Sequence, residues 1–165
     1  MSAVPKDTRQ LLPMSVARLD AVMAIETTAY AFPWSRGNFI DSLASGYAAQ
    51  MLCDAQGGLL GYFVAMAGVD EMHLLNITVA PAHEHRGHAR FMLDQLSALC
   101  EVRGARQLWL EVRESNARAR MIYRRRGFVH VGVRKGYYPA PQGQREDAVV
   151  MSLQIAFAGG RDALD

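Results

Sequence analysis

The sequence predicts a mixed α/β fold in which helices flank a single sheet, and two β-loop-α segments are the main observations behind this prediction. An apolar strand that ends at Val79 runs into a polar loop, and Gly87 then opens an amphipathic helix. A second apolar strand, residues 107–113, precedes another helix at 116–126. Because strands joined through a helix lie parallel in one sheet, we expect some parallel pairing.

The size and composition suit one soluble domain. The chain has 165 residues, of which 50% are hydrophobic and 21% charged, enough to bury a sizeable core. We expect this domain to span residues 10–155, with a flexible tail at 1–9 and a C-terminal tail at 156–165. The longest apolar run, Leu59 to Val69, is shorter than the about 20 residues that a membrane-spanning helix needs.

The first third of the chain predicts one edge strand and two helices. Residues 10–14 read as a short strand, and Pro13 suits an edge better than a sheet centre. Ser15 is the expected N-cap of the first helix. Ser35 is the expected N-cap of a second helix, which runs through Leu43.

The middle of the chain predicts a hairpin, a third strand and a long helix. Strands are expected near 48–54 and 58–68, joined by a turn at 56–58, and a third strand at about 71–79. The helix at 87–103 has an apolar face. Its members are Phe91, Leu93, Leu96, Leu99 and Cys100.

The last third predicts three strands around one helix. The strand at 107–113 and the helix at 116–126 are followed by a strand at 128–134, a loop rich in Gly, Pro and Tyr, and a final strand at 147–155. No repeat or low-complexity linker interrupts this order, so one domain remains the simplest interpretation.

Residues 76–90, NITVAPAHEHRGHAR, form a candidate phosphate loop. Backbone N–H groups at the start of a helix form an anion site, which the positive end of the helix reinforces. Gly87 and Ala89 leave room for a pyrophosphate near the backbone. Glu84 would repel such a ligand unless its carboxylate points away.

The histidines of this loop do not predict a metal site. His83, His85 and His88 lie beside Glu84, but Gly87 interrupts the helical spacing that a His-Glu-His zinc site needs. Exposed loop histidines are the simpler interpretation, so we expect no metal.

Glu111 is the residue that most strongly suggests chemistry. In residues 107–113, QLWLEVR, aliphatic residues alternate with a face that includes Trp109 and Glu111. A carboxylate in such a strand either pairs with a cation, here Arg113 or Arg134, or takes part in a reaction.

Positive charge is concentrated in one part of the chain. Residues 103–135 contain ten Lys or Arg and two Glu, a balance of +8, whereas the whole chain has a net charge of +2. Such a region favours an acidic or phosphate-bearing ligand, or forms a solvated helix face. A non-catalytic module that binds RNA or the ribosome is therefore one alternative, which a steep salt dependence would support.

These motifs together resemble the GNAT superfamily of acetyl-CoA-dependent N-acetyltransferases. The resemblance rests on the glycine loop, on the LWLEV strand, and on an Asn-x-x-Ala-x-x-x-Tyr-x-x-x-Gly-Phe pattern at 116–128. The Tyr-Tyr-Pro loop at 137–139, the Arg-Glu-Asp-Ala that follows it and AFPWS at 31–35 resemble more closely the ribosomal-protein-alanine N-acetyltransferases (the RimI family). The first position of the loop pattern departs from the family, because Glu84 stands where Gln or Arg is usual.

The resemblance implies a particular fold and site. The fold would be a mostly antiparallel sheet of six to seven strands with four helices and a V-shaped splay between two central parallel strands. Glu111 would be the general base and Tyr123 the general acid, with core packing as the alternative for Tyr123. Acetyl-CoA would bind the strand end at Ile77, Thr78 and Val79, the loop residues His85, Arg86, Gly87, His88, Ala89 and Arg90, and Asn116, whose alternative role is helix capping.

The resemblance also implies an acceptor site and a function. Trp34, Tyr137 and Tyr138 would contact the acceptor peptide, and Glu146 and Asp147 could neutralise a cationic side chain of it. The expected reaction is acetyl transfer to the N-terminal alanine of a small-subunit ribosomal protein. Another protein N-terminus, a lysine or a small amine is the alternative within the superfamily. With Cys53 and Cys100 far apart in the sequence and no secretory signal evident, we expect a cytoplasmic enzyme with no stable nucleic-acid or membrane contact.

Overall fold

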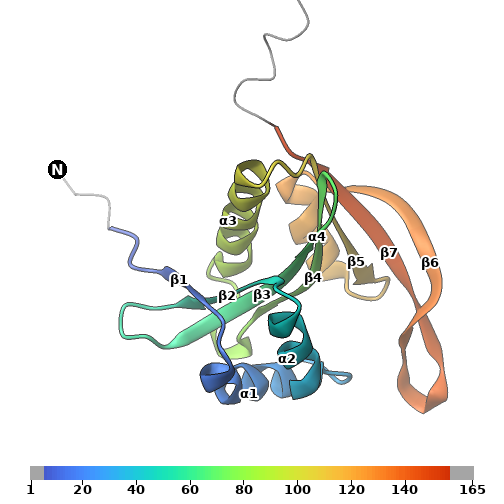
Figure 1. The fold of residues 1–165 in the computed structure, drawn as a ribbon. Coiled ribbons are helices and arrows are strands. Elements are labelled where there is room, and N and C mark those ends of the chain that lie inside the picture. Colours follow the sequence, from blue (N-terminus) through green and yellow to red (C-terminus); the bar gives the residue numbers. More distant parts are fainter. Residues whose placement is uncertain (1–5, 157–165) are drawn as a thin grey trace, which may run out of the picture. The chain divides into compact units, whose positions relative to one another are not determined.

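The computed structural model describes residues 6–156, and this part of the chain forms seven strands and four α-helices (Figure 1). The strands are β1 (Gln10–Pro13), β2 (Ala48–Cys53), β3 (Leu59–Ala67), β4 (Glu71–Val79), β5 (Gln107–Arg113), β6 (Val129–Pro139) and β7 (Arg145–Gln154). The helices are α1 (Leu19–Ala29), α2 (Arg36–Ala44), α3 (His88–Val102) and α4 (Ala117–Arg126). The strand order is β1-β2-β3-β4-β5-β7-β6, which confirms the predicted mixed α/β class.

The contacts of the chain group into two compact units. The first contains Met1–Val64 and Ile77–His88, and the second contains Ala65–Asn76 and Ala89–Asp165, as far as these residues are described. The expected tails at 1–9 and 156–165 lie largely outside the described residues. Among the helices that are described, none has the length and apolar character needed to cross a membrane.

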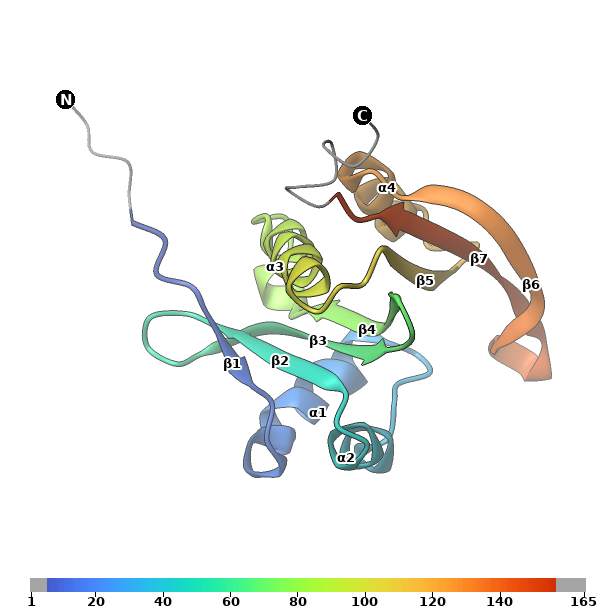
Figure 2. The same cartoon turned by 45° about the horizontal axis from the view of Figure 1, so that its top comes forward.

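The first unit packs two helices against its strands. Figure 2 shows α1 and α2 together on one face of β1, β2 and β3. Several large side chains of this unit are at most 1% exposed: Leu19, Val22, Phe39, Leu52, Tyr62 and Phe63. Burial of a large apolar side chain contributes about 1.5–3 kcal/mol to the stability of the fold. These layers therefore form a stable support for the loops of the first unit.

The strand β1 is an edge strand, as predicted. It pairs antiparallel with β2 from Gln10↔Cys53 to Pro13↔Gln50. Pro13 is its last residue, where the missing N–H costs no central ladder hydrogen bond.

The two predicted N-caps have different outcomes. Ser35 caps α2 as expected: its hydroxyl accepts from the Asn38 N–H at 3.1 Å, and its own N–H donates to Asn38 Oδ1 at 2.9 Å. The prediction for Ser15 was wrong, because its side chain makes no cap hydrogen bond. A 3-10 turn at Val16–Arg18 comes first, and its backbone bond from the Arg18 N–H to the Ser15 carbonyl closes the turn without the hydroxyl.

The second unit is built around β5. This strand pairs in parallel with β4 from Glu71↔Gln107 to Leu74↔Leu110, and antiparallel with β7 along its whole length to Arg113↔Ala148. Figure 2 shows β5, β7 and β6 side by side. The ladder with β4 therefore covers the first part of β5, while the segment that carries Glu111 is paired with β7.

The helix α3 buries most of the face that its periodicity predicts. Leu93, Leu96 and Cys100 are completely buried together with Met92, whereas Phe91 and Leu99 are half-buried. Burial raises the pKa of the Cys100 thiol to about 11, so this cysteine is an inert core residue. Cys53 is likewise a free buried thiol.

The strand β6 is longer than predicted. A strand was expected at 128–134 followed by a loop, but β6 continues through the Tyr-Tyr-Pro segment to Pro139. Its pairing with β7 shifts between Arg134 and Tyr138, and Gly136 in this interval has φ +58°, a conformation that other residues rarely adopt. A bulge of this kind is invisible in the alternation pattern, because it adds residues without ending the strand.

Candidate active site

Glu111 lies in an enclosed polar cluster of the second unit. Its side chain is 6% exposed, and its Oε2 accepts a hydrogen bond from His73 Nε2 at 2.5 Å. The Arg134 Nε lies 3.3 Å from Oε1 at ion-pair distance. A buried carboxylate needs such partners to remain charged. Of the two expected cations, Arg134 is therefore the partner, and Arg113 pairs with Glu146 instead.

The two oxygens of Glu111 have different environments. Oε2 is hydrogen-bonded to His73, whereas Oε1 is buried and has no hydrogen bond, since the contact with Arg134 is not aligned for one. On the same face of β5, Trp109 Nε1 is also buried without a hydrogen-bond partner. Buried polar atoms without partners are rare, and an acceptor and a donor on one face mark this part of β5 as a candidate site.

Aromatic rings surround this cluster. His73 stacks on Trp109 with ring centroids 3.8 Å apart and an interplanar angle of 10°. The Arg134 guanidinium lies over the Trp109 ring at 6.0 Å and the Tyr137 ring at 5.4 Å. These contacts give the carboxylate a rigid, weakly hydrated environment. The sequence pattern identified Trp109 and Glu111, but gave no signal for His73, which comes from another strand.

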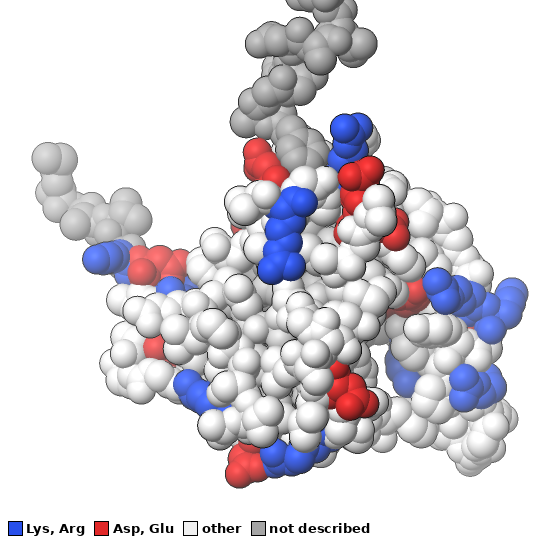
Figure 3. Space-filling view, viewed as in Figure 1, with Lys and Arg blue, Asp and Glu red and all other residues white. Residues whose placement is uncertain are grey.

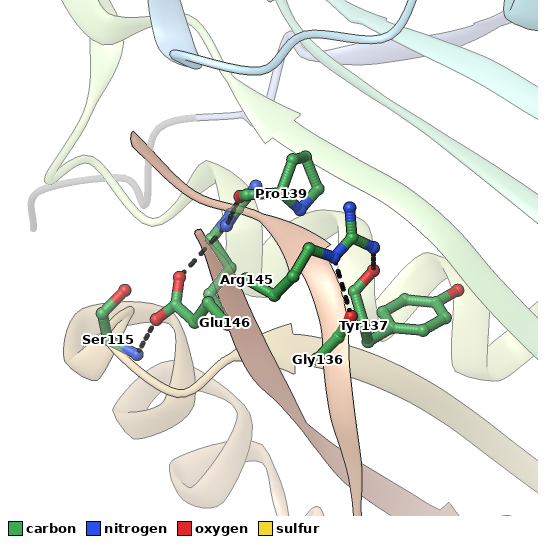
Figure 4. Close-up of polar contacts among 7 residues, drawn as sticks. Ser115, Gly136, Tyr137, Pro139, Arg145 and Glu146 are labelled. Atoms are coloured by element: carbon green, nitrogen blue, oxygen red, sulfur yellow. Dashed lines mark hydrogen bonds and ion pairs between the residues drawn. The ribbon is translucent and has the colours of Figure 1, made fainter. Parts of the chain in front are cut away.

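The Tyr137–Tyr138 segment is held from β7. Figure 4 shows Arg145 reaching two carbonyls of β6: it donates to Gly136 at 3.0 Å and to Tyr137 at 2.9 Å. The two tyrosine rings contact edge to face at 4.9 Å, and Arg113 lies 4.5 Å from the centre of the Tyr138 ring. Burial, and then the charge of Glu111, raise the pKa of Tyr138, so this phenol stays protonated.

The carboxylates of Glu146 and Asp147 are both hydrogen-bonded within the chain. Glu146 accepts from the Ser115 N–H at 2.8 Å, as Figure 4 shows. It also accepts from Arg113 at 3.1 Å. Asp147 accepts from the Gly136 N–H at 2.8 Å and from Lys135. The hydrogen bond from Ser115 lowers the pKa of Glu146, and that from Gly136 lowers the pKa of Asp147. These contacts hold the β6–β7 hairpin, and the role of the two acids toward a cationic side chain of the acceptor stays a prediction.

Tyr123 lies on α4 and Asn116 at its N-cap, and each has a structural role. Tyr123 is 9% exposed, and its ring packs against Phe128 with centroids 5.7 Å apart. Asn116 caps α4, its Oδ1 accepting from the Ala119 N–H at 3.1 Å. The packing and capping alternatives are therefore present, and roles toward a substrate stay predictions. The capping residue is Asn116 and not Ser115.

The strand end at Ile77–Val79 belongs to the first unit and is held by Tyr30. The Tyr30 hydroxyl is 2.7 Å from Thr78 Oγ1 and donates to the Ile77 carbonyl at 3.2 Å. Burial raises the pKa of Tyr30 to about 12, so the phenol is a permanent donor. The sequence pattern did not identify Tyr30, because nothing in the spacing of α1 links it to β4.

The same unit contains a buried acid, Glu26 on α1. Its side chain is 1% exposed, and its Oε1 accepts from the Tyr62 hydroxyl at 2.7 Å. Its Oε2 accepts from the Trp34 N–H at 3.2 Å. Trp34 also packs on Phe39 and lines a hollow of about 360 Å³ with Asn38, Asp41, Ser42, Ser45 and Tyr47. Glu26 therefore fixes the backbone of the segment in which the acceptor contact at Trp34 is predicted.

The candidate phosphate loop contains two residues with positive φ, a feature that backbone anion sites often have. His85 has φ +64° and Gly87 has φ +79°, and no atom lies within 4 Å of where a Gly87 side chain would begin. Gly87 is thus needed for its backbone conformation more than for space. Left-handed residues next to residues with negative φ can turn backbone N–H groups toward one side, an arrangement that suits a phosphate.

The side chains of this loop differ in burial and in their partners. The His88 side chain is buried, and its Nδ1 accepts from Arg9 at 3.3 Å. Burial, and then the charge of Arg9, lower the pKa of His88, so it stays neutral. Glu84, His85 and Arg86 are exposed. Within the described part of the chain, no group of three or more His, Cys, Asp or Glu has the arrangement of a metal site.

The strand–loop–helix that contains Gly87 and the enclosed carboxylate on the next strand are the features behind the family resemblance. The chain belongs to the acetyltransferase (GNAT) family, whose sequence model matches residues 19–128. This confirms the family resemblance, the GNAT fold and the class of enzyme.

More specific similarities cover most of the chain. It is 38% identical over 143 residues to the ribosomal protein bS18-alanine N-acetyltransferase of Salmonella typhimurium, covering 87% of this chain and 95% of that protein. The crystal structure of the ribosomal-protein-S18-alanine N-acetyltransferase from Escherichia coli matches with a TM-score of 0.83 at 36% identity, covering 93% and 97% of the two chains. A phosphinothricin acetyltransferase from Sinorhizobium meliloti in complex with AcCoA shares the fold, with a TM-score of 0.73 at 20% identity and coverage of 90% and 89%.

Proposed function

We propose that this chain transfers the acetyl group of acetyl-CoA to the N-terminal alanine amine of a small-subunit ribosomal protein, with bS18 as the first candidate. The relatives from Salmonella typhimurium and Escherichia coli are named for this reaction at 38% and 36% identity. The observation that supports the chemistry is the enclosed Glu111 carboxylate, with one oxygen held by His73 and the other without a hydrogen bond.

Glu111 is the proposed general base. The acceptor amine must be neutral to attack the thioester carbonyl, and an α-amine with a pKa near 7.7–8.0 is roughly a quarter neutral at pH 7.4. A lysine amine is neutral in only about one molecule in a thousand at that pH. An α-amine therefore needs only a modest base, and a carboxylate acting through one water can take the proton as attack proceeds.

Tyr123 is the proposed general acid. As the tetrahedral intermediate collapses, the C–S bond breaks and the coenzyme leaves as a thiolate, which takes a proton from the phenol. A phenol with a pKa of about 10 suits a thiol with a pKa of about 8.5. Backbone N–H groups near Val79 would stabilise the oxyanion. A covalent enzyme intermediate is not part of this proposal, because burial makes Cys100 a poor nucleophile.

Acetyl-CoA binding is assigned to two backbone segments. The conformation of His85 and Gly87 supports a pyrophosphate site made of the amides of His85 to Arg90. The strand end at Ile77–Val79 would pair with the pantetheine arm in the manner of an added strand. Asn116 is proposed as a further contact, with the helix cap already using its Oδ1.

The acceptor peptide is assigned to aromatic residues on rigid supports. Tyr137 and Tyr138 are held by Arg145 and by Arg113, and the Trp34 backbone is held by Glu26. Aromatic side chains on fixed backbone bind a peptide with little loss of conformational entropy. Tyr137 is 42% exposed, so it has free surface for such a contact.

The test uses two acceptor peptides with acetyl-CoA and mass spectrometry. One peptide begins Ala-Arg-Tyr with a free amine, and the other has a blocked N-terminus and an internal lysine. Acetylation of the first alone is the expected result. Acetylation of the lysine alone would overturn the proposed substrate while leaving the family intact, and transfer to neither would contradict the proposed reaction on protein substrates.

A further inference from the structure

His73 makes the shortest polar contact of the candidate site, although no motif includes it. It lies on β4, 38 residues before Glu111, and its Nε2 is 2.5 Å from Glu111 Oε2. The register of the parallel ladder pairs His73 with Trp109. Glu111 is the next residue of β5 on the same face as Trp109, so the imidazole lies within reach of its carboxylate.

The imidazole is fixed in place by its surroundings. Its ring lies parallel to Trp109 at 3.8 Å, and its side chain is only 11% exposed. The charged and titratable groups around the pair are Arg134, which lies 3.3 Å from Glu111 Oε1, and Tyr138, whose pKa the Glu111 charge raises. Arg134 is 48% exposed, so His73 is the more enclosed of these two partners of Glu111.

We propose that His73 is the positioning residue of Glu111: its Nε2–H bond to Oε2 fixes the carboxylate and leaves Oε1 as the oxygen that receives the amine proton. The inference rests on the proposed function, because it assumes that Glu111 is the base. A hydrogen bond to a charged acceptor is stronger than one between neutral groups, and the stacked ring has one orientation in which to make it.

His73 neither gains nor loses a proton in this scheme. The amine nitrogen forms the new bond to the acetyl carbon, its proton passes to Glu111 Oε1, and the C–S bond breaks with protonation of the leaving thiolate. His73 donates the same hydrogen bond throughout. Its loss should therefore lower kcat and leave the affinity for acetyl-CoA unchanged.

Two substitutions at this position separate the hydrogen bond from the ring. His73→Phe keeps a ring to stack on Trp109 and removes the donor, whereas His73→Gln keeps an N–H donor at a similar reach. Since a charge-assisted hydrogen bond is lost, we expect His73→Phe to lower kcat by about ten- to a hundredfold. The KM for acetyl-CoA should change less than about twofold, and His73→Gln should recover most of the rate.

A matched control and a second donor-free variant complete the series. His130 is exposed on β6, its Nε2 lies 2.9 Å from the Gly132 carbonyl, and it has no proposed role in the reaction, so His130→Phe should keep the wild-type kcat. If His73→Phe does not fold, as judged by its melting temperature, His73→Met provides the donor-free side chain instead.

A double-mutant cycle decides whether His73 acts through Glu111. If it does, adding His73→Phe to Glu111→Gln should lower kcat by less than about twofold beyond Glu111→Gln alone. Independent, multiplying losses, or a wild-type kcat for folded His73→Phe, would overturn the inference. A wild-type kcat for Glu111→Gln itself would instead overturn the proposed base, whatever His73 does.

Discussion

At the scale of single residues, the environment of Glu111 separates its two oxygens. One is held by His73 and the other is buried without a hydrogen bond. A surface carboxylate would be solvated equally on both sides. The asymmetry is therefore a consequence of the neighbouring strands, and it agrees with the proposed role of Glu111 as a base.

Replacing Glu111 with Gln tests the base directly. The amide cannot accept the amine proton, so kcat should fall by about 10²–10⁴-fold. Acetyl-CoA binding, measured by calorimetry, should stay nearly unchanged. Glu114→Gln is the matched control, because Glu114 is exposed three residues further along the chain. Turnover close to wild type in Glu111→Gln would remove Glu111 from the mechanism.

Replacing Tyr123 with Phe distinguishes an acid from a packing residue. The ring that contacts Phe128 at 5.7 Å is kept, and only the hydroxyl is removed. We expect a lower turnover with little change in melting temperature. A large drop in melting temperature at unchanged turnover would show that the hydroxyl serves the core and not the reaction.

At the scale of elements, the starts of the helices illustrate how local rules succeed and fail. Ser35 satisfies two backbone groups at the start of α2 through a reciprocal capping box with Asn38. Ser15 is also a serine just before a helical segment, but its hydroxyl makes no cap hydrogen bond. The turn that follows it is closed by a hydrogen bond between backbone groups. Residue preference is thus a guide to caps, and the backbone path decides whether a cap forms.

The two serines form a matched pair for a stability measurement. Ser35→Ala should reduce the free energy of unfolding by about 0.5–2 kcal/mol, because the cap is lost. Ser15→Ala should change it by less than about 0.5 kcal/mol, as is usual for surface sites. Urea unfolding followed by circular dichroism gives both values, and equal losses in the two variants would contradict this account of the caps.

At the scale of the whole molecule, the positive charge of residues 103–135 is partly used within the chain. Arg126 pairs with Asp94 at 2.5 Å, and Arg113 pairs with Glu146. Figure 3 shows Lys and Arg side chains over β6 and its hairpin with β7. The excess of +8 counted from the sequence therefore overstates the charge that remains for a partner.

The ion pairs of this hairpin predict a dependence of stability on acid. The pKa values of Glu146 and Asp147 are lowered in the folded chain from 4.5 and 3.8. Their contribution is present above those values and is lost as the pH falls through the lowered ones, because the unfolded chain then binds more protons.

A variant checks this assignment. The free energy of unfolding of the wild type should decrease as the pH is lowered from 5 to 3. The free energy of unfolding of the double variant, Glu146→Gln with Asp147→Asn, should decrease less over the same range. Urea titrations at the two pH values measure both slopes. A slope that is identical in the variant and the wild type would place the acid sensitivity elsewhere in the chain.

Much of the fold follows from local patterns. The alternation in residues 107–113 correctly predicts the faces of β5, and the strand at 71–79 has its predicted bounds. The bulge in β6 was not predicted, because Gly136 and the neighbouring tyrosines are residues typical of a loop. They form part of a strand only because β7 provides hydrogen-bond partners for their backbone.

The sequence by itself determined the order of the elements, the family motifs and the candidate roles of Glu111 and Tyr123, because each depends on residues close together along the chain. Only the tertiary structure decided which groups meet. His73 reaches Glu111 through the register of β4 with β5, and Tyr30 reaches Thr78 across 48 positions. Such contacts depend on the pairing and packing of distant segments, and no local pattern encodes them.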